Sequence, residues 1–483
     1  MRLHRLALFL GAPVLSLSGC VSTSARRPAG EVESMVQERA GARLSAVESD
    51  TSIQNATSEL LKQPLSPESA VQLALLNNPS FRGRVAELGI AQAALAQAAL
   101  LENPKVHASL RFPRGGEGRQ TGSEIGGTIN FLDLITLPLR RKLASTQLEQ
   151  AKYRLGHETL ELATEVKAAY YHLQATRQTL ELRRFALEGL EAASILSERQ
   201  RKAGNISKLD EASQQAAYQE AKLEVGRAEV EEVAARERFA ALIGAQAGPW
   251  TIADKLAEPP AVEPVLEKIE TTALSQRWDL AAARREPSVL KQALRVNRLS
   301  MFSSIDVGID SERELDGVTG VGPEVEMSVP LFDRKQASSA KLKAQLRQSQ
   351  STLAGLETQI RLQTRIAHAQ LVQTRAAISS YQTKLLPLKR RIVAETLKNY
   401  NYMLLGVYQL LESKRAEIEA QSAYIDTLKS YWVHWAELER AAGGRLPQDA
   451  LQPAPAEKQE EQPEQPSRPE QPQPGHEHHE EKP

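Results

Sequence analysis

The chain has little of several features on which common protein functions depend. It contains one cysteine in 483 residues, which excludes an internal disulfide and a cysteine-based zinc site. Lysine plus arginine and aspartate plus glutamate are equal at 60 each, so no overall basic charge attracts nucleic acid. Aromatic residues make up only 5% of the chain. The sequence also lacks a serine elbow, a zinc-binding helix motif and a cofactor fingerprint, so we expect neither an enzyme nor a bound cofactor.

The single cysteine ends an N-terminal segment that is typical of secreted proteins. Two arginines precede an apolar run over 6–17, which is too short to cross a bilayer as a helix and therefore predicts a cleaved signal peptide over 1–19. Leu17-Ser18-Gly19-Cys20 resembles the bacterial lipobox, in which the cysteine receives a lipid. We therefore expect lipidation at Cys20, the alternative being an ordinary signal peptide with an incidental cysteine. Val21 in the second mature position favours the outer membrane over retention at the inner one.

Beyond the N-terminus, a pattern of helix, paired strands and long helical hairpin occurs twice, about two hundred residues apart. In the first repeat, 65–245, period-two alternation predicts a β-hairpin over 105–132. Leucines at heptad spacing then predict a helical hairpin over 143–242, which turns at Gly204.

The second repeat, 263–442, restarts the same pattern. Alternation predicts a β-hairpin over 304–332, and a helical hairpin over 336–441 turns at Gly406, with a break at Pro387. Four strands per chain cannot close a membrane barrel, so several copies must share one.

The segments outside the repeats have different compositions. Residues 20–64 are rich in Ser, Ala, Arg and Glu, and they predict a lipidated tether or a segment laid over the outside of the body. Residues 443–483 are dominated by Pro, Gln and Glu, so we expect a disordered tail. Its closing His476, His478 and His479 could bind Cu, Zn or Ni ions, or they are incidental to a solubilising tail.

The order of several short motifs resembles the TolC family of outer-membrane efflux proteins over about residues 60–442. The motifs are Ala70 to Leu75 with Asn78-Pro79, Ala203 to Asp210, Arg277 to Leu280, and Val329 to Asp333. The resemblance implies a mainly α chain with a small β part that assembles as a homotrimer. In that assembly, long antiparallel helical hairpins form an α-barrel, and four strands per chain contribute to a 12-stranded β-barrel.

The resemblance also implies a location and partners. The protein would lie in the outer membrane, extend into the periplasm, and work with a periplasmic adaptor (membrane fusion) protein and an inner-membrane pump of the resistance-nodulation-division type. The lipobox adds the expectation of a lipid anchor. We expect the exit duct of a tripartite efflux system that passively conducts substrates, with metal ions such as copper favoured and drugs next. The alternatives are a type I secretion channel and a lipid-anchored periplasmic coiled-coil scaffold without a pore. Strand pairs at matched places in both halves favour a channel over the scaffold.

Two groups of residues match functional positions of that family. The hairpin tips, which meet the adaptor in family members, correspond to Lys202, Ala203, Gly204, Asn205, Leu405, Gly406 and Val407. Asp210 and Glu412 each stand six residues past a tip glycine and match acidic residues near the closed periplasmic aperture. The alternative is that both acids complement the first turns of their helices. Tyr408 and Arg415 depart from the family's usual tip pattern.

The polar faces of the predicted strands line the channel lumen if the apolar faces meet lipid. They carry His107, Arg111, Glu124, Asp306, Asp310, Glu324 and Glu326. Carboxylates exceed basic groups on these faces, and several chains multiply the excess, so we expect a preference for cations.

Overall fold

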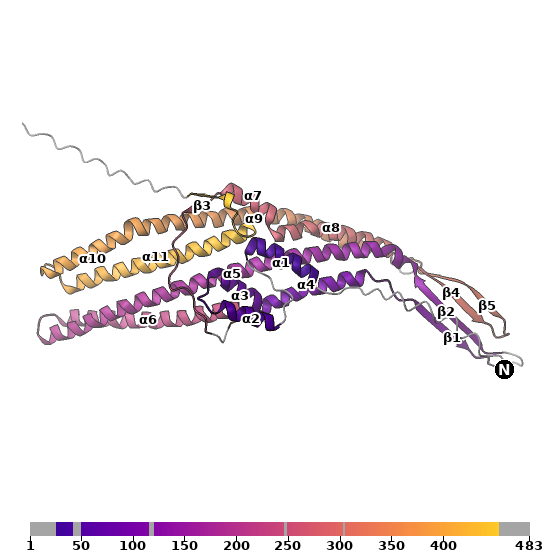
Figure 1. The fold of residues 1–483 in the computed structure, drawn as a ribbon, viewed down its shortest axis with the longest axis horizontal. Coiled ribbons are helices and arrows are strands. Elements are labelled where there is room, and N and C mark those ends of the chain that lie inside the picture. The colour runs from indigo at the N-terminus through magenta and orange to yellow at the C-terminus, as the bar shows by residue number, and fades with distance from the viewer. Residues whose placement is uncertain (1–25, 42–49, 115–119, 246–248, 303–304, 454–483) are drawn as a thin grey trace, which may run out of the picture.

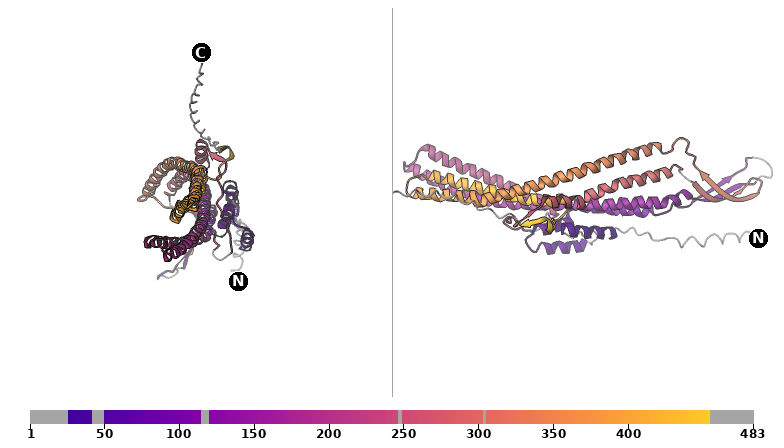
Figure 2. Two further views of the ribbon diagram at one scale, coloured as in Figure 1. Left: turned by 90° about the vertical axis from the view of Figure 1, so that its left-hand side faces the viewer. Right: turned by 90° about the horizontal axis from the view of Figure 1, so that it is seen from above.

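The protein is an elongated molecule in which helices fill most of the length and a small sheet forms one end (Figure 1). The structure is a computed structural model that describes residues 26–41, 50–114, 120–245, 249–302 and 305–453. The expected signal peptide and Cys20 lie outside the described residues. Viewed along the long axis, the long helices form a curved layer with the N-terminal helices on one side (Figure 2). Among the described residues, no helix has the length and apolar character needed to cross a membrane.

The sheet has four antiparallel strands in the order β1-β2-β4-β5, so the two repeats pair through β2 and β4. The strands are β1 (Lys105–Arg111), β2 (Gly122–Asn130), β4 (Ile305–Arg313) and β5 (Thr319–Met327). The second hairpin has a short loop, because β4 continues to Arg313 and β5 begins at Thr319. In the sequence, the apolar alternation is interrupted by Ser311, Gly320 and Gly322. The backbone hydrogen bonds that pair β4 with β2 and β5 form whatever the side chains are, so the strands continue through these positions.

The first helical hairpin consists of α5 (Phe131–Lys202) and α6 (Lys208–Ile243). The start of α5 predicted at 143 was too late: the helix begins directly after β2 and includes Pro138. Asn130 caps it, with its side-chain oxygen accepting a hydrogen bond from the Asp133 backbone N–H at 3.2 Å. At 72 residues and about 1.5 Å per residue, α5 is roughly 110 Å long.

The second helical hairpin consists of α9 (Gln336–Ser380), α10 (Leu386–Asn401) and α11 (Val407–Ala442). Between α9 and α10 lies a π-helical turn, η2 (Tyr381–Leu385), rather than the break expected at Pro387. The wider turn accommodates the proline, which occupies one of the first positions of α10.

Short helices precede each β-hairpin: α3 (Pro67–Asn77) and α4 (Pro79–Ala98) in the first repeat, α7 (Leu266–Gln276) and α8 (Trp278–Leu299) in the second. Asn78 caps α4 by accepting from the Phe81 backbone N–H at 3.1 Å, and its amide donates to the Leu242 carbonyl at 2.9 Å. Arg277 separates α7 from α8. Asn78 and Arg277 are therefore structural residues at matched helix junctions.

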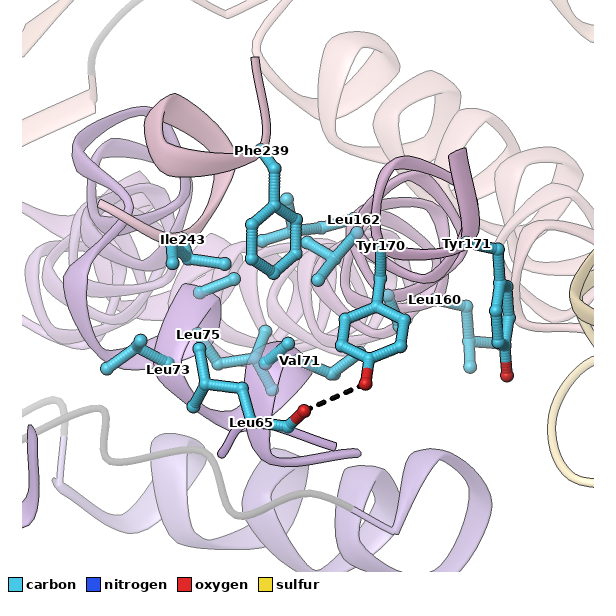
Figure 3. Close-up of a cluster of buried hydrophobic side chains, with 14 of the residues drawn as sticks. Leu65, Val71, Leu73, Leu75, Leu160, Leu162, Tyr170, Tyr171, Phe239 and Ile243 are labelled. Carbon is cyan, nitrogen blue, oxygen red and sulfur yellow. Dashed lines mark hydrogen bonds between the residues drawn. The ribbon is translucent and has the colours of Figure 1, made fainter. Parts of the chain in front are cut away.

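A buried cluster anchors the first hairpin to the body (Figure 3). Tyr170 of α5 donates a hydrogen bond from its hydroxyl to the Leu65 carbonyl at 2.8 Å, and its ring packs edge-on against Phe239 of α6. Phe239 and Ile243 are fully buried. These contacts hold α3, α5 and α6 together near the middle of the molecule.

The two outer segments carry more structure than their composition indicated. The segment predicted as a tether contains α1 (Arg26–Ala40) and α2 (Asp50–Leu60), and Val32 and Val36 of α1 are fully buried because α1 packs on α5. This arrangement corresponds to the second expectation, a segment laid over the body.

The predicted disordered tail is ordered at its beginning. After the short 3-10 helix η3 (Gln448–Ala450), β6 (Leu451–Pro453) pairs with β3 (Val262–Pro264). Backbone pairing with β3 therefore orders residues whose composition alone predicts disorder. Residues 454–483, with the three tail histidines, lie outside the described part.

Candidate channel surfaces

The four-stranded sheet has one apolar and one charged face, because side chains alternate along each strand. Side chains of the apolar face are exposed, Val106 at 76% and Val325 at 68% of their full area. The large exposed side chains of this face are Val106, Leu110, Ile125, Ile129, Val307, Ile309, Val321, Val325 and Met327. An apolar surface of this kind marks a site of contact with a membrane or a protein.

All the charged residues expected in the lumen share the opposite face of the sheet. They are His107, Arg111, Glu124, Asp306, Asp310, Glu324 and Glu326. Lys105 and Glu312 lie on the same face and were not among the residues expected there. Lys105 pairs with buried Asp306 at 3.0 Å.

Arg111 connects two acids of this face. Its guanidinium lies 2.8 Å from Glu124 Oε2 and 2.7 Å from Glu312 Oε1. Ser109 donates a second hydrogen bond to Glu124 Oε2 at 2.9 Å. Even with Lys105 and Arg111 counted, carboxylates outnumber cations, which gives the face an acidic surface.

The tips of both helical hairpins lie at the end of the molecule opposite the sheet (Figure 1). At the first tip, Gly204 adopts a left-handed conformation with φ of 81°, and the Asn205 N–H donates to the Gln200 carbonyl at 2.8 Å. Lys202, Ala203, Gly204 and Asn205 are exposed, so this tip is open to contact.

The second tip turns differently from the prediction. The left-handed residue is Met403, with φ of 58°, and the Leu404 N–H donates to the Asn399 carbonyl at 2.9 Å. Gly406, expected as the turn residue, is the N-cap of α11. Leu405 and Gly406 are exposed, whereas Val407 is half-buried.

The two predicted aperture acids occupy different environments. Asp210 lies in the first turn of α6 and completes a capping box with the N-cap Ser207, since its Oδ2 accepts from the Ser207 N–H at 3.2 Å and from the Ser207 hydroxyl at 2.7 Å. This bonding supports the capping alternative for Asp210. Glu412 is exposed and lines a groove of about 470 Å³ between the two hairpins.

Tyr408 brings the two hairpins into electrostatic contact. Its hydroxyl is buried without a hydrogen-bond partner among the described residues. Burial, and secondarily the negative charge of Asp210, raises the pKa of Tyr408 above its ordinary value. Arg415, the other departure from the family's tip pattern, pairs with Glu419 at 3.1 Å and also lines the groove.

Comparisons with known proteins agree with this architecture. Residues 70–245 match the model of the outer membrane efflux protein family. The chain is 22% identical over 390 residues to the cobalt-zinc-cadmium resistance protein CzcC of Cupriavidus metallidurans, covering 79% of this chain and 90% of the relative.

Two solved structures share the fold. One is a membrane protein from Pseudomonas aeruginosa, with a TM-score of 0.66 and 18% identity over 78% of this chain and 93% of that one. The other is the open state of the MtrE outer membrane channel of Neisseria gonorrhoeae, with a TM-score of 0.63 and 17% identity over 78% and 89%. Over residues 70–245 the chain is therefore similar to the outer membrane efflux protein family, and over most of its length it shares the fold of these solved membrane proteins.

Proposed function

We propose that this chain forms the outer-membrane exit channel of a tripartite efflux system and conducts substrates without chemistry of its own. The observation that carries the proposal is the four-stranded sheet with an exposed apolar face, a charged face, and outer edges on β1 and β5 that pair with no other strand in the described part of the chain. Unpaired strand edges are not tolerated in lipid, so the edges must pair with further copies of the chain. Three copies supply twelve strands, an even number typical of outer-membrane barrels.

The helical end supplies the second half of the duct. Both hairpin tips project away from the sheet, so a sheet in the outer membrane places them deep in the periplasm. We propose that Lys202 to Asn205 and Leu405 to Val407 meet a periplasmic adaptor, which joins the channel to an inner-membrane pump of the resistance-nodulation-division type. A lipid on Cys20 would hold the N-terminal end at the membrane. Glu412, exposed at the groove between hairpins, is the better candidate of the two aperture acids.

Metal-ion efflux is the favoured substrate class. The relative CzcC is named for cobalt, zinc and cadmium resistance and spans most of this chain. The acidic face of the sheet suits passage of cations, because rings of carboxylates favour them in narrow pores.

Charge on the apolar face tests the proposal. Ile125→Arg and Ile309→Arg, near the middle of β2 and β4, should each impair outer-membrane assembly, because arginine facing mid-membrane lipid costs about 2–4 kcal/mol. Ser109→Arg, on the charged face, is the matched control and should assemble. Purified protein in a planar bilayer should give steady, cation-selective conductance.

Normal assembly of both apolar-face variants would argue against a barrel. The double variant Asp210→Ala, Glu412→Ala should loosen the aperture. If neither it nor the wild type conducted ions, a periplasmic scaffold would be favoured instead.

A further inference from the structure

His107 lies at the centre of a cluster of metal-ligating side chains on the charged face of the sheet. Its Nε2 is 3.5 Å from Asp310 Oδ1, 3.7 Å from Glu324 Oε2 and 4.0 Å from Glu124 Oε1. Ligand atoms of His107, Glu124 and Asp310 all lie within 4.8 Å of one another. Two ligands of a tetrahedral Zn²⁺ ion, each about 2.1 Å from it, stand about 3.4 Å apart. Small side-chain shifts would therefore bring this set to coordination distance.

The strand register builds this cluster from all four strands. His107 of β1, Gly126 of β2 and Asp310 of β4 stand in one cross-strand row, and Glu324 comes from β5. Gly126 leaves the necessary gap: a Cβ there would lie 2.5 Å from His107 Nε2 and 2.9 Å from Asp310 Oδ1. The imidazole thus crosses β2 over a residue without a side chain and reaches the acid on the next strand.

The oxygens nearest the imidazole lack hydrogen-bond partners. Asp310 Oδ1 and Glu324 Oε2 are both buried and unpaired among the described residues. Two acids of this face outside the cluster have cationic partners, since Asp306 pairs with Lys105 and Glu312 pairs with Arg111. Within the cluster, Glu124 pairs with Arg111 through Oε2 and turns Oε1 toward the imidazole. These acceptors therefore concentrate negative charge around one imidazole, and a bound cation would give the two oxygens the partner that they lack.

We propose that His107, Glu124, Asp310 and Glu324 form a binding site for a divalent transition-metal ion, with Zn²⁺ as the representative. One imidazole nitrogen with carboxylate oxygens suits Zn²⁺, Co²⁺, Ni²⁺ or Cu²⁺ better than Mg²⁺ or Ca²⁺, which prefer oxygen ligands alone. Metal binding at this site does not require the efflux function. Only the further idea, that exported ions contact this site on their way through the channel, rests on the proposed function.

Zinc titration of the full-length protein tests the site, with a chromophoric chelator as competitor. The tail histidines are first removed as ligands in the full chain by His476→Asn, His478→Asn and His479→Asn. In that background we expect one Zn²⁺ per chain, and His107→Asn or Asp310→Asn should weaken its affinity by at least about tenfold. Glu326→Gln, an acid of the same face that lies outside the cluster, should leave the affinity unchanged.

Gly126→Ala is the sharpest variant, because it keeps every ligand but fills the gap under the imidazole. It should weaken Zn²⁺ binding like His107→Asn, while circular dichroism and size-exclusion chromatography report whether the assembly has formed. Bound Cu²⁺ should show coupling to one imidazole nitrogen by electron paramagnetic resonance, and the coupling should disappear in His107→Asn.

The proposal would be overturned if His107→Asn and Asp310→Asn left the zinc affinity unchanged. It would also be overturned if replacing the three tail histidines abolished all Zn²⁺ binding. Conductance separates the two hypotheses. Zinc binding without conductance would contradict the channel alone, whereas conductance without zinc binding would contradict the metal site alone.

Discussion

Met403 occupies in the second helical hairpin the left-handed turn position that Gly204 occupies in the first. Their φ angles are 58° and 81°, and each is followed by a residue whose N–H bonds to the carbonyl five residues back. The same sequence offset separates Gly204 from Met403 and Val106 from Ile305, so the repeats are in register through both strands and tips. In this register Ser207 matches Gly406, and both are helix N-caps.

Glycine at position 403 should stabilise the second tip. A side chain in the left-handed region costs about 1–2 kcal/mol, which Met403→Gly removes at the expense of some chain entropy. We expect a net gain of about 0.5–1 kcal/mol, measured as a higher thermal-unfolding midpoint. Gly204→Ala, which introduces the same strain at the first tip, should lower the midpoint. A lower midpoint for Met403→Gly would contradict the assigned turn.

Gly156 of α5 should not tolerate a side chain. A Cβ there would lie 2.8 Å from two ring atoms of Trp278, which is only 1% exposed and cannot move aside. Gly156→Val should therefore destabilise the contact between α5 and α8 by about 1–3 kcal/mol. The control is Gly189→Ala in the same helix, where the added Cβ meets nothing within 4 Å. That variant should gain up to about 1 kcal/mol from helix propensity. Equal effects of the two substitutions would argue against the packing described.

Asp279 should make stability depend on acid pH. Burial alone would raise the pKa of Asp279, but the hydrogen bonds and charge of Arg277 hold it below its ordinary value. A group whose pKa is lower in the folded state stabilises the fold above its unfolded pKa of about 3.9, and this contribution is lost as pH falls through the folded value. Asp279→Asn should cost about 1–3 kcal/mol at neutral pH, because buried Arg277 loses its counter-charge.

The measurement is the thermal-unfolding midpoint of wild type and Asp279→Asn between pH 2.5 and 6. The difference between the two proteins should shrink as pH falls below about 4. A difference that stays constant across this range would show that the Asp279 charge is not what stabilises the fold.

Arg111→Gln should strengthen cation selectivity in the planar bilayer. Arg111 neutralises part of Glu124 and Glu312, so its removal leaves both carboxylates free to attract cations. The reversal potential in a salt gradient should move toward the cation equilibrium potential. Glu312→Gln should move it in the opposite direction. A reversal potential that neither substitution changes would place this face away from the conduction path.

Much of the architecture could be predicted from sequence because the signals are local. Ser66, Pro67 and Glu68 predict the start of α3, and the structure shows the expected cap, in which the Ser66 hydroxyl accepts from the Ser69 N–H at 3.1 Å. Alternation also identified the charged face of the sheet. Both depend on residues close together in the chain, where period and capping chemistry carry the information.

The remaining features depend on partners far along the chain. The second tip was misplaced at Gly406 because glycine is the usual left-handed residue, and nothing local indicates that Met403 takes that conformation. The cluster around His107 joins all four strands, and its closeness became visible only once β2 was paired with β4. Likewise, Leu451 pairs with Pro264, which lies far away in the sequence, and local composition gives no sign of this pairing.

The pairing of β6 with β3 fixes where the end of the chain departs from the body. In Figure 1, β3 lies between the hairpin tips and the four-stranded sheet, away from both ends of the molecule. The chain therefore leaves the body at Pro453, at a point between its two ends. A fluorophore or affinity handle at that point would report on the assembled protein without obstructing either mouth of the duct or the docking of an adaptor.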